Sequence, residues 1–119
     1  MPEEVSILAD LGIIQIDSYG EVTGADMLAT MEEVLDVTRE RGLTRVFVDA
    51  SKETSLPSTL PIHQFGALLS KDAMMLRFAV LVNDQVREDL HFLETVTKNR
   101  GMQVKMFDSR EEAMAWLME

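Results

Sequence analysis

The sequence predicts an α/β fold, a single domain whose mostly parallel sheet begins with an antiparallel N-terminal hairpin strand. Short apolar runs rich in β-branched residues alternate with stretches of helical periodicity, which is typical of strand–helix units with right-handed crossovers. Most of these runs are continuously apolar, as in a sheet covered on both faces. The 119 residues suit one core. We therefore expect one domain over residues 1–119 with the element order β-β-α-β-α-β-α-β-α.

Two neighbouring apolar runs open the chain. They extend from Val5 to Ala9 and from Gly12 to Ile16, and only Asp10 and Leu11 lie between them. Such close spacing indicates two antiparallel strands joined by a tight turn.

The first helix has clear start and stop signals. Thr23 is placed as an N-cap, and Asp26, three residues later, completes an acidic form of the capping box. Gly42 is well suited to end the helix. The residues expected to face the core recur at helical spacing, and they are Met27, Met31, Val34, Leu35 and Thr38.

The middle of the chain continues the alternation. Residues 45–49 and 77–82 are predicted to form buried strands, because they are continuous runs of β-branched and aromatic residues. Ser51 to Pro61 is dense in loop-forming residues. It leads into a helix expected over Ile62 to Ser70.

Two more helices and a strand are expected in the last third. Asp84 is placed to cap the first helix, and residues 103–107 form the strand. Ser109, followed three residues later by Glu112, opens the final helix with a capping box. The inward positions are Val86, Leu90, Leu93 and Val96 in the first helix and Ala113, Trp116 and Leu117 in the second.

Composition excludes several classes of protein. The chain has no cysteine, which rules out a disulfide scaffold, a zinc ribbon and a thiol nucleophile. Its net charge of −10 argues against binding nucleic acid or an anionic membrane surface. The acidic start lacks the basic region of a signal peptide, and the longest strongly apolar run, Phe78 to Val82, is too short for a membrane helix. We expect a cytoplasmic protein.

The residue patterns predict no metal site, no cofactor and no catalytic activity. The two histidines lack the spacing of metal ligands, and the chain lacks a glycine-rich phosphate loop. A trio for nucleophilic catalysis could be assembled from Ser51, His63 and Asp49, although the sequence around the serine is not a nucleophile elbow. An uncharacterised hydrolase is an alternative hypothesis on this basis.

Negative charge is concentrated at the start of the chain. Residues 1–38 contain nine acidic residues and no Lys or Arg, and the first basic residue is Arg39. This region could serve solubility alone, or it could meet a basic surface on a partner.

Methionine is abundant, with nine in the chain. Most are expected to fill the core, but Met-rich pockets also adapt to varied apolar ligands. The residues predicted to line such a pocket are Phe65, Leu68, Met74, Met75 and Leu90.

Several segments together share the pattern of a known group of proteins. They are the β-β-α opening, Val46 to Asp49, Arg77 to Val82, Phe92 to Thr95, Asn99 to Gly101, Val104 to Phe107 and Glu112 to Leu117. With these segments in this order, nearly the whole chain resembles the SpoIIAA-like group. This fold is shared by STAS domains, such as anti-sigma factor antagonists, and by lipid-binding CRAL-TRIO domains. The nearest resemblance is to small stand-alone bacterial proteins labelled STAS/SEC14 domain-containing.

The resemblance implies a non-enzymatic domain that binds partners, nucleotides or a small apolar ligand. In regulatory STAS proteins a D-x-S strand end precedes a phosphorylatable serine at a helix start. Asp49-Ala50-Ser51 matches the strand end, and Ser58 lies near the position of that serine. The chain departs from the pattern at Pro57, where an acid is usual, and at Leu60, where a glycine is usual.

The loop after the 45–49 strand is therefore the candidate anion or partner site. It is expected at the carboxyl end of a parallel strand and at a helix N-terminus, where backbone N–H groups favour anions. Its candidate residues are Asp49, Ser51, Ser55, Ser58 and Thr59. The alternative is a plain connector stiffened by its two prolines.

The sequence thus predicts a STAS-like regulatory or protein-interaction module of a bacterial cytoplasm, related to anti-sigma factor antagonists and active as a homodimer. A carrier of a small apolar ligand or lipid in a CRAL-TRIO-like pocket is the second hypothesis. The hydrolase is the third.

Overall fold

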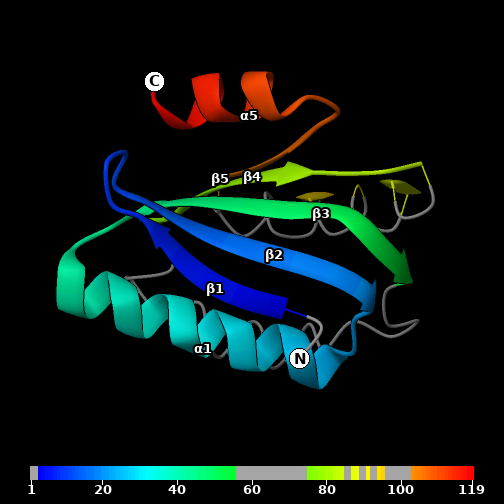
Figure 1. Cartoon of the computed structure of the whole chain (residues 1–119), viewed down its shortest axis with the longest axis horizontal. Helices are drawn as coiled ribbons and strands as arrows, with labels where there is room; N and C mark the ends of the chain where they lie inside the picture. The colour runs from blue at the N-terminus through cyan, green and yellow to red at the C-terminus, as the bar shows by residue number, and fades with distance from the viewer. Residues whose placement is uncertain (1–2, 56–74, 85–86, 89–90, 92–93, 96–102) are drawn as a thin grey trace.

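A five-stranded mixed sheet forms the centre of the structure, and its strands lie side by side in sequence order (Figure 1). The computed structural model describes residues 3–55, 75–84, 87–88, 91, 94–95 and 103–119. The strands are β1 (Glu3–Leu8), β2 (Ile13–Glu21), β3 (Arg45–Ser55), β4 (Arg77–Leu81) and β5 (Gln103–Phe107). β1 is antiparallel to β2, and every other neighbouring pair is parallel. The predicted hairpin and parallel sheet are confirmed.

The β1–β2 hairpin turns at a glycine in the left-handed region. Gly12 has φ 66°, and its N–H donates to the carbonyl oxygen of Leu8 at 2.9 Å. A side chain would strain this backbone, so glycine is favoured here. Beyond the turn, Val5 lies opposite Ile16 and Ile7 opposite Ile14. These apolar side chains therefore share the face of the sheet that is packed into the core.

Helix α1 (Gly24–Arg41) begins and ends where the sequence predicts. The N–H of Thr23 donates to the Asp26 carboxylate at 2.9 Å, and the N–H of Asp26 donates to the Thr23 hydroxyl at 3.1 Å. Gly42 ends the helix at φ 70°, with its N–H bonded to the carbonyl oxygen of Thr38. The capping box and the glycine stop are confirmed.

The predicted loop over Ser51 to Pro61 is wrong in its first part. Residues 51–55 continue β3, because the end of β2 runs beside them and supplies a backbone partner. Tyr19 lies opposite Lys52 and Glu21 opposite Ser55, with register shifts on the way. The second strand was predicted to end at Ile16 but extends to Glu21. Pairing between two long strands thus overrides the loop-forming composition.

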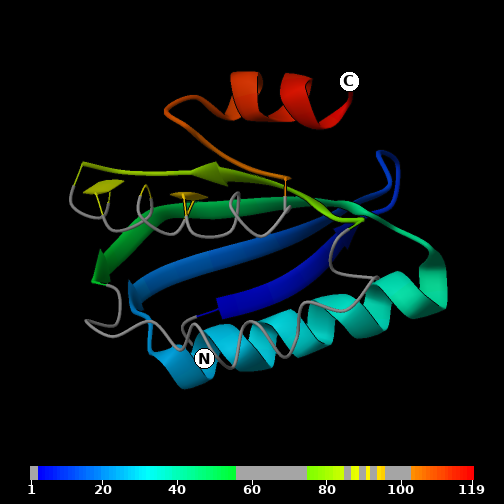
Figure 2. The same cartoon turned by 180° about the vertical axis from the view of Figure 1, so that it is seen from behind.

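Two layers of core cover the two faces of the sheet. α1 packs on one face, and α5 (Arg110–Leu117) packs on the other, over β3, β4 and β5 (Figures 1 and 2). Strand alternation separates the layers, since Val46 faces α1 and Phe47 faces α5. Ser109 caps α5 as predicted, and Ala113 and Leu117 are buried while Trp116 is partly buried.

The side chain of Glu3, the first residue of β1, forms hydrogen bonds with both β2 and α1. Its carboxylate accepts hydrogen bonds from the hydroxyls of Ser18, at 2.7 Å, and Thr30, at 2.9 Å. Burial raises the pKa of Glu3, which outweighs the opposite effect of these two hydrogen bonds. Both hydroxyls are themselves buried.

Some predicted elements lie outside the described residues. The helix over Ile62 to Ser70 is one, and so are the inward positions Val86, Leu90, Leu93 and Val96 of the next helix. The described residues of that segment are helical: Arg87, Glu88, His91, Glu94 and Thr95. In the part of the chain that the structure describes, no helix is long and apolar enough to cross a membrane.

Candidate functional site

The structure describes three of the predicted site residues with their side chains. Asp49 and Ser51 lie in β3, and Met75, two residues before β4, is 64% exposed. Ser55 is the last residue of β3. The other predicted residues lie outside the described part, and they are Ser58, Thr59, His63, Phe65, Leu68, Met74 and Leu90.

Asp49 and Ser51 form a closed polar pair in β3, at the point where its pairing with β4 ends. One carboxylate oxygen of Asp49 accepts from the N–H of Ser51 at 3.1 Å and from its hydroxyl at 2.5 Å. Residues two apart in a strand share one face, so the side chains meet directly. The hydroxyl proton of Ser51 therefore points at the Asp49 carboxylate. These two hydrogen bonds fix the conformation of this part of β3.

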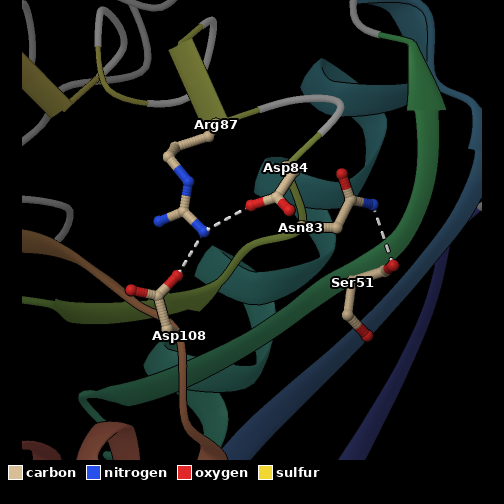
Figure 3. Close-up of polar contacts among 5 residues, drawn as sticks. All are labelled: Ser51, Asn83, Asp84, Arg87 and Asp108. Atoms are coloured by element: carbon tan, nitrogen blue, oxygen red, sulfur yellow. Dashed lines mark hydrogen bonds and ion pairs between the residues drawn. The ribbon is translucent and has the colours of Figure 1, made fainter.

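Asn83 connects this strand end to the next strand. Its side-chain amide donates to the carbonyl oxygen of Ser51 at 2.8 Å (Figure 3). Asn83 follows β4, so the contact joins the carboxyl end of β4 to the part of β3 just beyond their last backbone pair. The sequence predicted a strand that ends at residue 82 and a helix cap at Asp84, and it assigned no contact to Asn83.

Arg87 connects β4 to β5 in the same way. Its guanidinium lies 3.0 Å from the carboxylate of Asp84 and 2.5 Å from that of Asp108, which follows β5 (Figure 3). The hydrogen bond with Asp108, and then that with Asp84, raises the pKa of Arg87. Sequence reasoning missed both Arg87 and Asp108, because neither belongs to a recognisable motif. Side chains thus join β3 at Ser51 to the carboxyl end of β4, and the carboxyl end of β4 to that of β5.

Three carboxylates form a row across the sheet next to this edge. Glu4 of β1 lies opposite Asp17 of β2, and Asp17 lies opposite Asp49 of β3. We call these three residues the acidic row. Their strand positions alternate with the α1-facing core residues, so the row lies on the face that carries α5. None of the three forms an ion pair with another residue among those described.

A shallow depression of about 280 Å³ lies at the acidic row. The residues around it are mostly polar, and they are Glu4, Asp17, Ser18, Tyr19, Asp49 and Lys52. The hydrogen bond between Tyr19 and Glu4 raises the pKa of the Tyr19 hydroxyl. The amide of Gln15 donates to both oxygens of Asp17, at 3.0 and 3.2 Å. Each carboxylate of the acidic row thus has a hydrogen-bond partner nearby: Tyr19 for Glu4, Gln15 for Asp17 and Ser51 for Asp49.

The sequence carried a signal for part of this surface. From Ile13 to Tyr19 the residues of β2 alternate, with Ile14, Ile16 and Ser18 facing α1, and Gln15 and Asp17 facing away. The predicted strand ended at Ile16, so Asp17, Ser18 and Tyr19 were not recognised as part of this alternation. The contact of Asp17 with residues from β1 and β3 depends on register, which no local pattern specifies.

A family model described as SpoIIAA-like matches residues 13–118. The chain belongs to the SpoIIAA-like family. The match covers every element from β2 to α5, and so the fold expected from the resemblance is confirmed. A comparison with curated proteins found no match.

Two solved structures share the SpoIIAA-like fold with this chain. One is an uncharacterised protein of the DUF3478 family from Shewanella loihica PV-4, with 17% identity, a TM-score of 0.63, and coverage of 97% of this chain and 91% of the other. The second is the anti-sigma factor antagonist SpoIIAA in its unphosphorylated form, with 13% identity, a TM-score of 0.60, and coverage of 97% and 96%. At these identities the likeness concerns the fold.

Two other kinds of site, a metal site and the hydrolase trio, can be compared with the described residues of this SpoIIAA-like chain. Within them, no three acidic or histidine side chains are arranged to hold a metal ion. Asp49 and Ser51 of the hydrolase hypothesis bond directly to each other, whereas a Ser–His–Asp triad needs the histidine between them. His63, its third member, lies outside the described part, so the trio stays a prediction.

Proposed function

We propose that this SpoIIAA-like protein is a non-enzymatic interaction module of a bacterial cytoplasm that binds a partner protein through the acidic row. The observation that carries the proposal is that Glu4, Asp17 and Asp49 lie directly opposite one another on three neighbouring strands. They lie on the face of the sheet that carries α5. The partner presents Lys or Arg side chains to this line. The protein acts as a homodimer.

The energetics of the acidic row support a cationic partner. Like charges placed directly opposite on neighbouring strands repel one another. Gln15 donates to Asp17, Ser51 donates to Asp49, and Tyr19 bonds to Glu4, which offsets part of this repulsion. Lys52 borders the same depression but forms no ion pair with the row among the described residues. A cationic side chain of a partner would therefore still be attracted to the row, and this attraction would speed the encounter.

The polar contacts of Ser51 support a binding role over a catalytic one. Its hydroxyl and its N–H both bond to Asp49, and its carbonyl oxygen bonds to Asn83. These contacts occupy the polar groups of Ser51 and hold this part of β3 in one conformation. The shared fold with the anti-sigma factor antagonist SpoIIAA is consistent with this role.

The test compares two charge-matched double variants. Glu4→Gln with Asp17→Asn removes two charges from the acidic row, and Glu32→Gln with Glu33→Gln removes two exposed charges from α1. Each protein is immobilised and exposed to extract of the source bacterium, and captured proteins are measured by quantitative mass spectrometry. We expect the wild-type partner to be lost with the row variant and retained with the α1 variant. Equal capture by both variants would contradict the proposal.

Added salt provides a second measurement on the same partner. Attraction between exposed charges weakens as ionic strength rises, since the screening length falls to about 3 Å at 1 M salt. Binding by the wild type should therefore decrease with salt, while the residual binding of the row variant should depend on salt less steeply.

The carrier of a small apolar ligand stays a prediction. Of its predicted lining residues the structure describes Met75 alone, which is exposed.

A further inference from the structure

We propose that two copies of the chain pair through the outer edge of β1. The two β1 strands run antiparallel with Ser6 at the centre, and the two five-stranded sheets join into one. This inference names the surface of the homodimer and rests on the homodimer proposed above.

The two edges of the sheet differ in their protection. At the β5 edge, the carboxylate of Glu94 accepts from the N–H of Met106 at 3.1 Å, so a side chain covers an outward backbone group. At the β1 edge, no hydrogen bond from a described residue outside β2 reaches the backbone of residues 3–7. An edge strand without such cover is a template for pairing with another strand.

The apolar side chains of β1 also lack full burial. Val5 and Ile7 are only half-buried, whereas their partners in β2, Ile16 and Ile14, are 4% and 0% exposed. A strand added outside β1 would cover the outer sides of Val5 and Ile7.

Geometry restricts the register of a symmetric pair. A two-fold axis perpendicular to the sheet keeps each side chain on its own face, so a residue can lie opposite only residues of the same face. For a strand of six residues, the two registers with the most pairs are centred on Val5 and on Ser6.

Charge and apolar matching favour the register centred on Ser6. It places Val5 opposite the second copy's Ile7, a pair of β-branched residues that suits a sheet. It also places Glu4 opposite the second copy's Leu8 and keeps the two copies of Glu4 four positions apart, about 14 Å along the strands. Centring on Val5 would place Glu3 opposite Ile7 and bring the Glu4 copies within two positions, about 7 Å.

Glu3 does not block this pairing. A charge that points inward on an edge strand usually discourages association. Here Glu3 is held by Ser18 and Thr30 at the start of β1, outside the segment from Glu4 to Leu8 that pairs in the Ser6 register. The edge without such hydrogen bonds, residues 3–7, thus contains the Val5 and Ile7 side chains that match in this register.

A cysteine substitution tests the pairing directly, because the chain contains no cysteine. Ser6 is exposed, and at the two-fold centre its two copies would have Cβ atoms about 4.5–5.5 Å apart, close enough for a disulfide with little adjustment. The matched control is Glu111→Cys, exposed on α5. Under mild oxidation we expect Ser6→Cys to form a disulfide dimer nearly completely, and Glu111→Cys to stay mostly uncrosslinked. Equal crosslinking of the two variants would overturn the proposal.

A charge exchange at the same position provides the second arm. Ser6→Lys or Ser6→Glu alone places like charges opposite each other and should weaken dimerisation by about two- to fivefold, whereas a mixture of the two variants should restore it. Sedimentation equilibrium measures the dimer, and circular dichroism verifies folding. Ser6→Thr is the neutral control. If both charged variants dimerise like wild type, the surface is wrong although the homodimer stands. A monomeric wild type would contradict the homodimer itself.

Discussion

The side-chain amide of Asn83 takes the place of a backbone partner for Ser51. The β3–β4 ladder ends at the pair Asp49 and Leu81, and continuing its register would put Ser51 opposite Asn83. β4 ends at Leu81, and the N–H of Val82 bonds to Phe107 of β5 on the other side. The Asn83 amide still donates to the Ser51 carbonyl oxygen at 2.8 Å (Figure 3). One side chain thus extends the pairing of two strands beyond their last backbone contact.

Removing this amide should loosen the end of β3. We expect Asn83→Ala to lower the free energy of unfolding by about 1 kcal/mol, because a half-buried carbonyl oxygen loses its donor. Urea unfolding measures the loss, and hydrogen exchange should quicken in residues 50–55. The control is Asp84→Ala, whose side chain is 97% exposed. Identical exchange at the end of β3 in the two variants would show that the Asn83 contact does not hold it.

Glu3 should make folding stability depend on pH with an unusual sign. Burial, reinforced by the nearby charge of Asp26, raises the pKa of Glu3 in the folded protein. Its contribution to stability is therefore fully present below the ordinary pKa of glutamate and is lost as pH rises through the raised value. At neutral pH the charged carboxylate costs stability, so Glu3→Gln should be more stable than wild type.

The measurement for Glu3 is urea unfolding of both proteins at a series of pH values. The advantage of Glu3→Gln should be largest at neutral pH and should shrink as pH falls through the raised pKa. Gln retains an oxygen that accepts from Ser18 or Thr30, so the variant keeps most of the local geometry. A variant less stable than wild type at neutral pH would mean that the two hydrogen bonds outweigh burial.

Asp26 should show the opposite dependence. Hydrogen bonds from the N–H and the hydroxyl of Thr23 lower the pKa of Asp26, because both favour the charged carboxylate. This contribution is present above the ordinary pKa of aspartate and is lost as pH falls through the lowered value. Asp26→Asn should therefore destabilise α1 at neutral pH, and the difference from wild type should vanish in acid. Helix content by circular dichroism at several pH values is the measurement, and a constant difference would contradict it.

Local patterns predicted the parts of this fold that local interactions determine. Thr23, Asp26 and Gly42 are within one helix, and their roles follow from residue type and spacing alone. The five strands were placed because each is a short run with strong β preference. What local patterns could not predict was the length of β2 and β3, since each long strand end exists only beside the other.

The polar surface was beyond sequence reasoning for a related reason. Glu4, Asp17 and Asp49 come from three strands, and only the register brings them into one row. The link from Arg87 to Asp108 likewise depends on where two strands end. The resemblance pointed to Asp49 and Ser51, and the structure places Asp49 in this row and Ser51 next to it, but the row itself has no sequence motif.

Arg77 and Trp116 fasten α5 to the sheet from positions far apart in the sequence. The guanidinium lies 4.1 Å from the centre of the Trp116 ring and donates to the Trp116 carbonyl oxygen at 2.9 Å. A cation at the C-terminal end of a helix also interacts favourably with the helix dipole. Phe107 completes the contact, with its ring 5.8 Å from that of Trp116.

Arg77→Met should therefore weaken the docking of α5. We expect a loss of about 1 kcal/mol in unfolding free energy from the cation–π contact and the hydrogen bond. Removing the buried Nε, which has no hydrogen-bond partner among the described residues, offsets part of the cost. Trp116 is the single tryptophan, so its fluorescence during urea unfolding reports on α5 directly.

The same substitution at the other end of α5 is the matched control. Arg110 lies over the Phe47 ring at 4.8 Å, but it is exposed and sits at the N-terminal end of the helix, where a cation opposes the dipole. Arg110→Met should therefore change stability by less than about 0.5 kcal/mol. If Arg110→Met destabilised the protein as much as Arg77→Met, position at the helix end would not matter, and loss of apolar packing by the arginine side chains would explain both effects.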